Sequence, residues 1–338
     1  MLYTFGLVKH ANIRYRDSFI RLSRCELQAM LHALSIDCEM KQEALGGADF
    51  ISFECRSLSP GEISFLSRHS SAAFLAEKAG GGLLRPLSFE RRDYLGEDLP
   101  EVLKYKGKTS PSFTRLMVNM ALSLSPFCFS ASPVTLFDPL CGKGTSCFCA
   151  LQSGMNAVGL DTDKKAVREA SDYFSRYLKF HMLKHAVHQR SETCGSRSLP
   201  VTEFVFADTK EHYQAGDTRF LALALGDTAD CGALFRRKAA HLVVADLPYG
   251  VQHAPQSGAK AEPFNVFLRR SLASWKKSLM PGGVAAVSFN TLVTPYAKVA
   301  GLAEEAGFAV CSHEPYTRLR HEVEQAVVRD AVFLMNEP

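Results

Sequence analysis

The feature that most constrains the fold is a glycine-containing turn between an apolar run and a helix-forming stretch. The apolar run covers residues 134–137, the turn reads D-P-L-C-G-K-G-T over 138–145, and the helix-forming stretch covers 146–152. A strand, a glycine turn and a helix in this order are typical of the edge where an open α/β sheet binds its ligand. Gly142 and Gly144 let the backbone approach a ligand without a Cβ clash.

Two common nucleotide-binding turns fit this stretch poorly. The third glycine of a dinucleotide-binding fingerprint would fall at Cys147. Lys143 does not stand in the G-x-x-x-x-G-K-[ST] frame of a phosphate-binding loop. The sequence therefore argues against an NAD site and against a P-loop.

Apolar strand patterns and helix patterns alternate along the rest of the chain, which predicts a parallel, doubly wound sheet that ends in a hairpin. Residues 187–216 break the alternation, because they are rich in Ser, Arg, Gly and Asp, and we interpret them as an insertion. The predicted strands are 134–138, 156–161, 241–245, 284–289, 308–311 and 325–335, and the predicted helices are 145–152, 164 towards 185, 264–279 and 295–306.

The third strand of this sheet has two candidates, because two apolar runs end close to an aspartate. One precedes Asp208 and the other precedes Asp227. One connecting helix of ordinary length fits between residues 227 and 246, whereas a start at Asp208 leaves a longer connection than such units use. We predict the strand that ends at Asp227, and Asp208 remains the alternative.

Residues 1–80 read as β-α-β-β-α-β, the order of a ferredoxin-like α+β domain. Capping-box sequences at 23–26 and 59–62 predict the starts of its two helices. A triple glycine at 80–82 marks the boundary, and residues 81–108 read as a connector to a second domain at 109–338.

Composition limits the class of protein. Of the 338 residues, 46% are hydrophobic and 22% are charged, as in ordinary soluble chains, and a net charge of +4 is compatible with a polyanionic partner.

The ten cysteines form no C-x-x-C, and the first residues carry no signal-peptide pattern, which predicts reduced thiols in the cytoplasm. The sequence contains no run of about eighteen apolar residues, so no membrane span is expected. Three histidines at helical spacing, His181, His185 and His188, lack a partner set, so no metal site is expected.

A second motif, D-L-P-Y-G at 246–250, follows the apolar strand 241–245. An exocyclic base amine is a weak nucleophile, because its lone pair is delocalised into the ring. The Asp246 carboxylate and the Leu247 carbonyl, held rigid by Pro248, can accept its N–H bonds and localise that lone pair. Tyr249 offers a face on which a base can stack, and Gly250 leaves room for close backbone approach.

These motifs resemble those of known enzymes. The first is similar to motif I of S-adenosylmethionine-dependent methyltransferases, and the second to the [DN]-P-P-[YFW] motif of enzymes that methylate exocyclic amines of bases. From about residue 104 onward the chain resembles the RNA guanosine-N2 methyltransferases often linked to THUMP domains. Residues 111–119 match their P-x-x-x-R-x-x-x-N helix, and Asp161 also matches. Leu247 stands where the first proline of the motif is commoner. Asp246 stands where the protein-glutamine methylases, whose motif reads N-P-P-Y, have asparagine, and this favours a base-amine methylase. Residues 83–108 leave no room for a THUMP domain.

The resemblance implies a seven-stranded, doubly wound, Rossmann-like methyltransferase sheet that binds S-adenosyl-L-methionine. Asp138 is expected near the methionine ammonium, Asp161 at the ribose hydroxyls and Asp227 at the adenine amine. Tyr249 and Gly250 are expected to contact substrate, and so are two residues of the 111–119 helix, Thr114 and Asn119. The expected cofactor-binding residues are Asp138, Pro139, Cys141, Gly142, Gly144, Thr145, Asp161, Thr162, Asp227 and Thr228.

The resemblance also implies a substrate, RNA, with guanosine N2 of tRNA or rRNA as the methylated atom. A DNA adenine-N6 methyltransferase and a non-catalytic RNA-binding protein on the same fold remain alternatives. Four arginines, Arg14, Arg16, Arg21 and Arg24, crowd the N-terminal unit and are expected either to face RNA or to serve solubility. The oligomeric state is left open.

Overall fold

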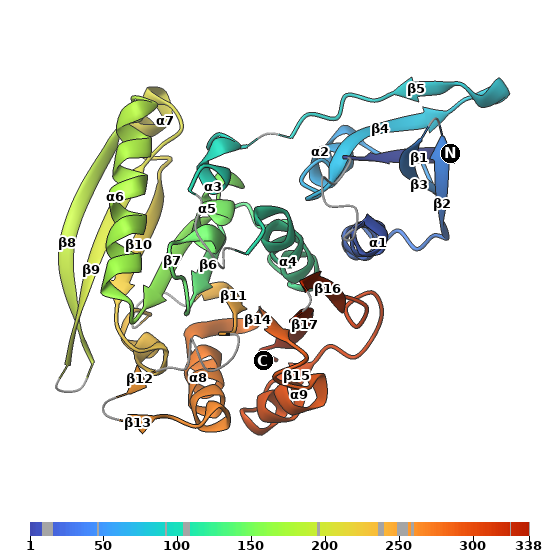
Figure 1. Ribbon diagram of the computed structural model, residues 1–338. Coiled ribbons are helices and arrows are strands. Elements are labelled where there is room, and N and C mark those ends of the chain that lie inside the picture. Colours follow the sequence, from blue (N-terminus) through green and yellow to red (C-terminus); the bar gives the residue numbers. More distant parts are fainter. Residues whose placement is uncertain are drawn as a thin grey trace.

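The computed structural model contains a small sheet at the N-terminus and a large sheet that follows it (Figure 1). The residues that the structure describes are 1–8, 16–45, 47–91, 93–103, 109–194, 197–235, 240–248, 256–257, 260–324 and 326–337.

The small sheet is antiparallel, with the strand order β2-β3-β1-β4-β5. Its first four strands and two helices follow the predicted β-α-β-β-α-β order. A fifth strand pairs with β4 just after the triple glycine, so the sheet extends past the predicted boundary at residue 80. The elements are β1 (Leu2–Leu7), α1 (Arg16–Ala33), β2 (Met40–Leu45), β3 (Ala48–Glu54), α2 (Pro60–Leu66), β4 (Ala72–Lys78) and β5 (Leu84–Pro86).

Only one of the two predicted capping boxes starts a helix. Ser59 accepts a hydrogen bond from the Glu62 N–H, and the Glu62 carboxylate accepts one from the Ser59 N–H, so the second prediction is confirmed. The first is wrong, because α1 begins at Arg16 and Ser23 lies buried within it. Upstream apolar side chains such as Phe19 are buried too, and their packing extends the helix beyond the local cap signal.

The large sheet has the order β15-β17-β14-β11-β6-β7-β10-β9-β8. Strands β14, β11, β6, β7 and β10 run parallel, and β17 is antiparallel between β14 and β15. From β15 to β10 this is the seven-stranded mixed sheet of the methyltransferase fold, as predicted. The strand order reverses between β6 and β11, which is the switch point where such sheets bind ligands.

The first half of the large unit contains α3 (Asp98–Glu101), α4 (Pro111–Leu124), β6 (Thr135–Asp138), α5 (Thr145–Gln152), β7 (Asn156–Asp161), α6 (Lys164–Phe180), β8 (His185–Cys194), β9 (Arg197–Phe206) and α7 (Lys210–Ala215). The second half contains β10 (Arg219–Leu225), the 3-10 helix η3 (Thr228–Ala233), β11 (Ala240–Asp246), the small pair β12 (Gln256–Ser257) and β13 (Lys260–Ala261), α8 (Phe264–Ser278), β14 (Leu279–Asn290), α9 (Tyr296–Glu305), β15 (Ala309–Val310), β16 (His321–Glu324) and β17 (Val327–Met335).

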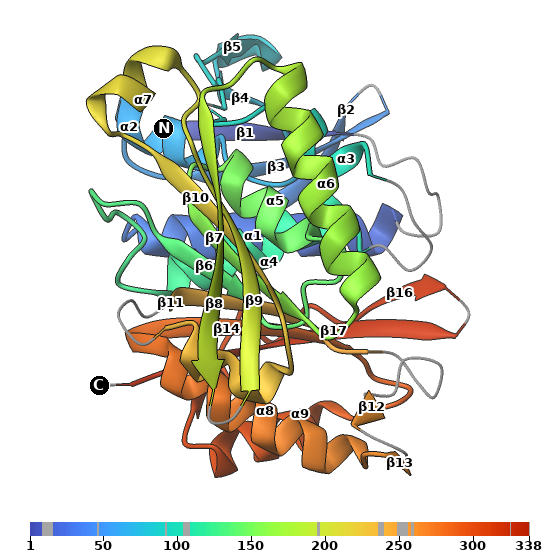
Figure 2. The same ribbon diagram turned by 90° about the vertical axis from the view of Figure 1, so that its left-hand side faces the viewer.

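Two connections differ from the prediction. Residues 187–216, interpreted as an insertion, form most of a long β8–β9 hairpin that widens the sheet (Figure 2). Only β9 buries alternate apolar side chains, such as Phe204 and Phe206, whereas β8 is a largely exposed edge strand whose polar sequence gives no core signal. The helix expected between 227 and 246 is only the short η3 in the residues described there.

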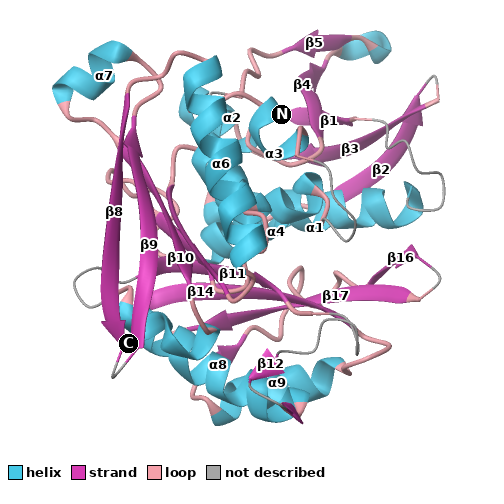
Figure 3. Ribbon diagram, turned by 60° about the vertical axis from the view of Figure 1, so that its left-hand side comes forward, coloured by secondary structure: helices cyan, strands magenta, loops and turns pink. Residues whose placement is uncertain are grey.

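Helices cover both faces of the large sheet (Figure 3). Side chains alternate between the faces along each strand, so Leu242 and Val244 pack with α4, α5 and α6, whereas Val243 and Ala245 pack with α8 and α9. Within the part of the chain that the structure describes, every helix is too short or too polar to cross a membrane.

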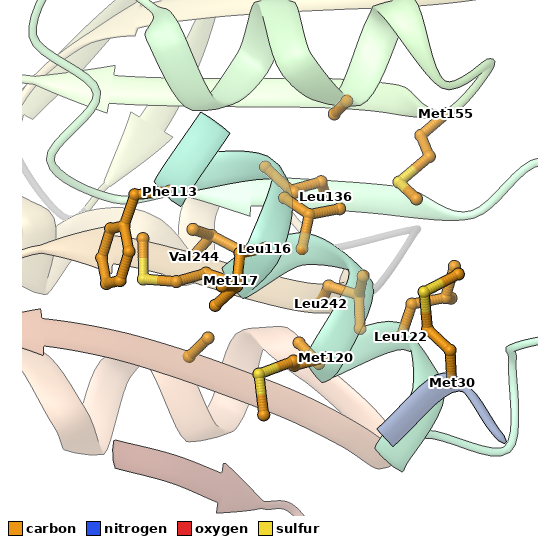
Figure 4. Packing of buried hydrophobic residues seen from close by; sticks show 14 of the residues in the cluster. Met30, Phe113, Leu116, Met117, Met120, Leu122, Leu136, Met155, Leu242 and Val244 are labelled. Carbon is orange, nitrogen blue, oxygen red and sulfur yellow. The ribbon is translucent and has the colours of Figure 1, made fainter. Parts of the chain in front are cut away.

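Helix α4 joins the two sheets. Its side chains Leu116 and Met120 lie against Leu136 and Leu242 of the large sheet, and Leu122 lies near Met30 of α1 (Figure 4). These residues belong to one hydrophobic cluster that continues from the small sheet into the large one.

A buried polar contact reinforces this junction. The Asn119 side chain donates to the Glu26 carboxylate at 2.7 Å and to the Arg68 carbonyl at 2.8 Å. Glu26 is fully buried, and its carboxylate also accepts from the N–H of Ser70 at 2.8 Å and from the Ser70 hydroxyl. The charge of a buried carboxylate is therefore compensated by donors from both units.

Candidate active site

Three aspartates lie at one edge of the large sheet. Asp138 ends β6, Asp161 ends β7 and Asp246 ends β11, and these strands are parallel neighbours in the order β11-β6-β7. Strand parity points all three toward the face covered by α4 to α6. They are close enough that the charges of Asp161 and Asp246 help raise the pKa of Asp138.

Asp138 is the most deeply buried of the three, with 3% of its surface exposed. Its Oδ1 accepts a hydrogen bond from the Leu140 N–H at 3.0 Å. Burial raises the pKa of Asp138 to about 7, against the opposing effect of hydrogen bonds from Ser146 and Leu140. A cation placed beside this carboxylate would therefore favour its ionised form.

The glycine turn after β6 has the conformation that its sequence suggested. Gly142 and Gly144 have φ angles of 49° and 87°, which favour glycine. A Cβ built on Gly142 meets nothing within 4 Å, so this part of the turn borders open space. Pro139, Cys141 and Thr145 are buried around the turn and support it.

A third glycine that sequence reasoning missed, Gly159 in β7, makes room for this turn. A Cβ there would lie 2.9 Å from Cys141 Sγ and 3.0 Å from Leu223 Cδ2, which is closer than side chains pack. A glycine inside a strand was the available signal, because such a residue often marks close approach of another part of the chain.

Asp161 accepts a hydrogen bond from the glycine turn. Its Oδ2 accepts from the Gly142 N–H at 2.7 Å, and its Oδ1 accepts from the Asp163 N–H at 2.9 Å. Burial raises the pKa of Asp161, and these backbone donors oppose that shift. A carboxylate has about four lone-pair positions, so these two bonds orient it without using its full acceptor capacity. Thr162, next in the chain, is exposed.

Replacing Asp161 with alanine is expected to weaken S-adenosylmethionine binding by about 1.5–3 kcal/mol, because bonds to a charged acceptor are lost. Isothermal calorimetry measures the change. Asp163→Ala is the matched control: Asp163 caps α6 through the N–H groups of Lys165 and Ala166, so it should lower stability by about 1 kcal/mol and leave affinity unchanged. Unchanged affinity in Asp161→Ala would remove this carboxylate from the cofactor site.

The predicted third strand is confirmed. β10 pairs in parallel with β7, with Leu225 opposite Asp161, and Asp227 follows it at the same edge. Asp208 instead follows the antiparallel β9, and its carboxylate bonds with the ring of His212 at 2.6 Å.

The surroundings of Asp227 add a partner that the sequence did not reveal. Arg270 of α8 donates to both of its oxygens, at 2.6 and 3.1 Å, and also bonds Glu262. Burial opposes ionisation, but Arg270 and the Ala229 N–H together hold the pKa of Asp227 below its usual value. A contact between Asp227 and the cofactor adenine stays a prediction.

The side chain of Thr228 has a partner in the core. It is buried, and its hydroxyl accepts a hydrogen bond from the Trp275 indole of α8 at 2.7 Å. A contact between Thr228 and the cofactor stays a prediction.

Asp246 accepts hydrogen bonds from two other segments and lies at ion-pair distance from a third. The Ser288 hydroxyl of β14 donates to its Oδ1, and the Thr109 hydroxyl, just before α4, donates to its Oδ2. Arg329 of β17 places Nη2 3.6 Å from Oδ2. Sequence reasoning missed all three. Arg329, which with Asp330 interrupts the apolar stretch 327–335, was the strongest available signal, because buried charges need partners.

The rest of the second motif is only partly described. Leu247 is buried, and its N–H donates to the Ser288 carbonyl at 2.9 Å, which anchors the residue after Asp246 to β14. Pro248 is half-buried. Tyr249 and Gly250 lie outside the described residues.

The two residues of α4 that were predicted to contact substrate are buried. Thr114 donates its hydroxyl to the Ser110 carbonyl at 3.1 Å. Asn119 lies at the junction with α1, where its amide bonds Glu26 and Arg68 as described above. In this structure the side chain of Asn119 serves the junction with the small unit, and its contact with substrate stays a prediction.

Among the described residues, no three His, Cys, Asp or Glu side chains come together as a metal-binding group. The polar groups at this edge of the sheet are the three carboxylates, their hydrogen-bond donors and the backbone of the glycine turn.

Comparison with known proteins gives only likenesses of structure. No protein-family description matches the sequence. No curated protein matches it either. The chain is similar to the crystal structure of TrmN from Thermus thermophilus, with 14% identity and a TM-score of 0.38, covering 91% of this chain and 64% of that one.

Two further solved structures are similar at the same level. The 16S rRNA N2 methyltransferase RsmC of Thermus thermophilus, solved with AdoMet and guanosine, has 13% identity and a TM-score of 0.38 over 88% of this chain and 50% of that chain. The rRNA methyltransferase aviRa of Streptomyces viridochromogenes has 15% identity and a TM-score of 0.38 over 69% and 88%. The chain thus spans half to two thirds of the length of TrmN and RsmC. At these scores the fold assignment rests on the strand order of the large sheet itself.

Proposed function

We propose that this chain transfers a methyl group from S-adenosyl-L-methionine to an exocyclic amino group of an RNA base, with guanosine N2 of tRNA or rRNA as the target. One observation carries the proposal. The strand order sets the Asp138 turn of β6 directly beside Asp246 of β11, at the switch point of the sheet.

The residues around the turn fit the cofactor. Asp138 is a buried carboxylate whose pKa of about 7 would fall beside an ammonium group, so a cationic amino acid moiety suits it. Asp161 can accept the two ribose hydroxyls, and the open space at Gly142 accommodates a ligand against the backbone. When bound, S-adenosylmethionine supplies an electrophilic methyl group on a sulfonium.

The residues after β11 would act on the acceptor amine. Asp246 accepts one N–H of the amine, and the Leu247 carbonyl accepts the other, so the nitrogen lone pair is directed toward the methyl group. Ser288, Thr109 and Arg329 hold the Asp246 carboxylate in place, so it need not reorganise during the reaction. The nitrogen then loses one proton, to Asp246 or to water.

The small sheet is proposed to position the RNA, although fewer arginines support this than the sequence suggested. Arg21 donates to the carbonyls of Arg318 and Arg320, so it fastens α1 to the loop before β16. Arg24 is exposed and can meet phosphate. Arg14 and the side chain of Arg16 lie outside the described part of the chain.

Methylation of purified nucleic acids tests the proposal. The protein is incubated with isotope-labelled S-adenosylmethionine and deproteinised tRNA, rRNA or genomic DNA, and digested nucleosides are read by mass spectrometry. We expect label in N2-methylguanosine from RNA, and labelling slower by roughly a hundredfold or more with Asp246→Asn. Label only in N6-methyladenine from DNA would replace the substrate class, and label at an adenine of RNA would replace the base alone.

A further inference from the structure

We propose that Arg329 is the positioning residue of this site: its guanidinium fixes the Asp246 carboxylate in the orientation that receives the amine. This inference rests on the proposed function, because it gives Asp246 the role of amine acceptor. It assigns a role to the final strand, which carries no motif.

The register of three neighbouring strands brings the two side chains together. Asp246 of β11 lies opposite Ser288 of β14, and Ser288 lies opposite Ala331 of β17. Arg329 precedes Ala331 by two residues, so its side chain leaves β17 on the same face as Asp246 and Ser288. That face is the one covered by α4.

Arg329 is buried, and its neighbours fix its position. Its side chain is 7% exposed, with Nη2 at 3.6 Å from Asp246 Oδ2. The guanidinium lies 5.1 Å from the centre of the Phe113 ring of α4, a cation–π contact. A buried guanidinium needs a partner of opposite charge, and Asp246 is such a partner.

The one histidine opposite Arg329 does not compete for Asp246. His321 of β16 faces Arg329 across the β16–β17 pair and lies 4.9 Å from the Phe113 ring. Burial lowers the pKa of His321 to about 4, and the charge of Arg329 contributes, so the ring is neutral at neutral pH. Arg329 is thus a cation at ion-pair distance from Asp246.

The two hydroxyl donors to Asp246 and its ion-pair partner Arg329 come from separate segments. Ser288 holds one oxygen, while Thr109 and Arg329 hold the other. Two fixed oxygens prevent rotation of the carboxylate about its last bond. Of these three groups Arg329 alone is charged, so it also offsets the repulsion between Asp246 and the neighbouring aspartates.

Kinetics of two substitutions test the role. Arg329→Met keeps the length and removes the charge, and it should lower kcat for RNA methylation by roughly tenfold to a hundredfold. S-adenosylmethionine affinity, measured by calorimetry, should stay within about twofold of wild type, since Arg329 is not proposed to contact the cofactor. Arg329→Lys should recover a large part of kcat. The matched control is Arg269→Met, which removes an exposed arginine that pairs with Glu305 on the opposite side of the sheet; it should behave as wild type.

Thermal melting gives a readout that needs no activity. Arg329→Met should lower Tm in the wild-type background, because Asp246 loses its charged partner, and should lower it less in an Asp246→Asn background. Equal lowering in both backgrounds would mean that Arg329 acts elsewhere and would overturn the pairing.

The outcomes separate the two proposals. A wild-type protein that methylates RNA, with an Arg329→Met variant of unchanged kcat, overturns the positioning role alone. A wild-type protein that methylates neither RNA nor DNA overturns the proposed function, and the role of Arg329 in it falls as well. Loss of S-adenosylmethionine binding in Arg329→Met would likewise overturn positioning through Asp246, because the cofactor site itself would then depend on Arg329.

Discussion

Asp246→Asn is expected to lower the rate of methyl transfer by roughly a hundredfold or more, while S-adenosylmethionine affinity changes by no more than a few fold. The asparagine amide has nearly the same shape, but one acceptor oxygen becomes an NH₂ donor. That donor would face either the bound amine or the hydroxyl of Thr109 and the guanidinium of Arg329, which are donors already. Asparagine therefore offers one acceptor oxygen fewer to the substrate amine and to the groups that hold this side chain.

Single-turnover kinetics with saturating cofactor measures this effect without a contribution from product release. Asp246→Asn is preferable to Asp246→Ala, because alanine would leave the buried Arg329 without this carboxylate and would destabilise the fold. Ser288→Ala is a useful companion: it removes one donor and should cost less. A rate for Asp246→Asn close to that of wild type would show that the amine isn't activated by this carboxylate.

Asp138→Asn is expected to stabilise the protein without ligand and to abolish most cofactor binding. The folded pKa of about 7 lies above the ordinary value of 3.8, so the folded protein retains a proton that the unfolded chain releases between these values. This contribution to stability is complete below pH 3.8 and is lost as the pH rises through about 7. Above pH 7 the buried charge costs on the order of a few kcal/mol, and asparagine avoids that cost.

Melting curves of wild type and Asp138→Asn at pH 5 and pH 8 test the sign. The variant should gain less at pH 5 than at pH 8, where the wild-type carboxylate is ionised in the folded protein as well. Calorimetry at pH 8 should show S-adenosylmethionine affinity reduced by roughly a hundredfold, because an ammonium loses its charged partner. Asp172→Asn, at an exposed position on α6, is the control and should change neither quantity. Equal stabilisation at both pH values, or unchanged affinity, would contradict this role of Asp138.

Local patterns predicted those parts of the fold that local chemistry determines. The Ser59 cap and the strand before Asp227 followed from a capping sequence and from connection length. The β8 strand could not be predicted in this way, because an edge strand with two polar faces has no hydrophobic alternation. The start of α1 was missed because tertiary packing overrode the cap at Ser23.

The residues of the candidate site also fall into those that local sequence order predicts and those that depend on how distant strands pair. Residues that end a strand, such as Asp138 and Asp246, are identifiable from the order of strand and turn. Ser288 and Arg329 reach Asp246 only through the pairing register of β11, β14 and β17, which involves residues 42 and 83 positions away in sequence. Asn119 illustrates the converse, because a motif match on a helix does not say which face meets the neighbouring unit.

The position of β17 has a consequence for the order in which the protein becomes competent. This strand is synthesised after all its neighbours, yet it lies inside the sheet between β14 and β15 rather than at an edge. Until it arrives, one side of β14 presents unpaired backbone groups, which invite association with other chains. The same insertion delivers Arg329 to Asp246. A nascent chain therefore closes this open edge of β14 and brings Arg329 to the proposed catalytic carboxylate in a single step.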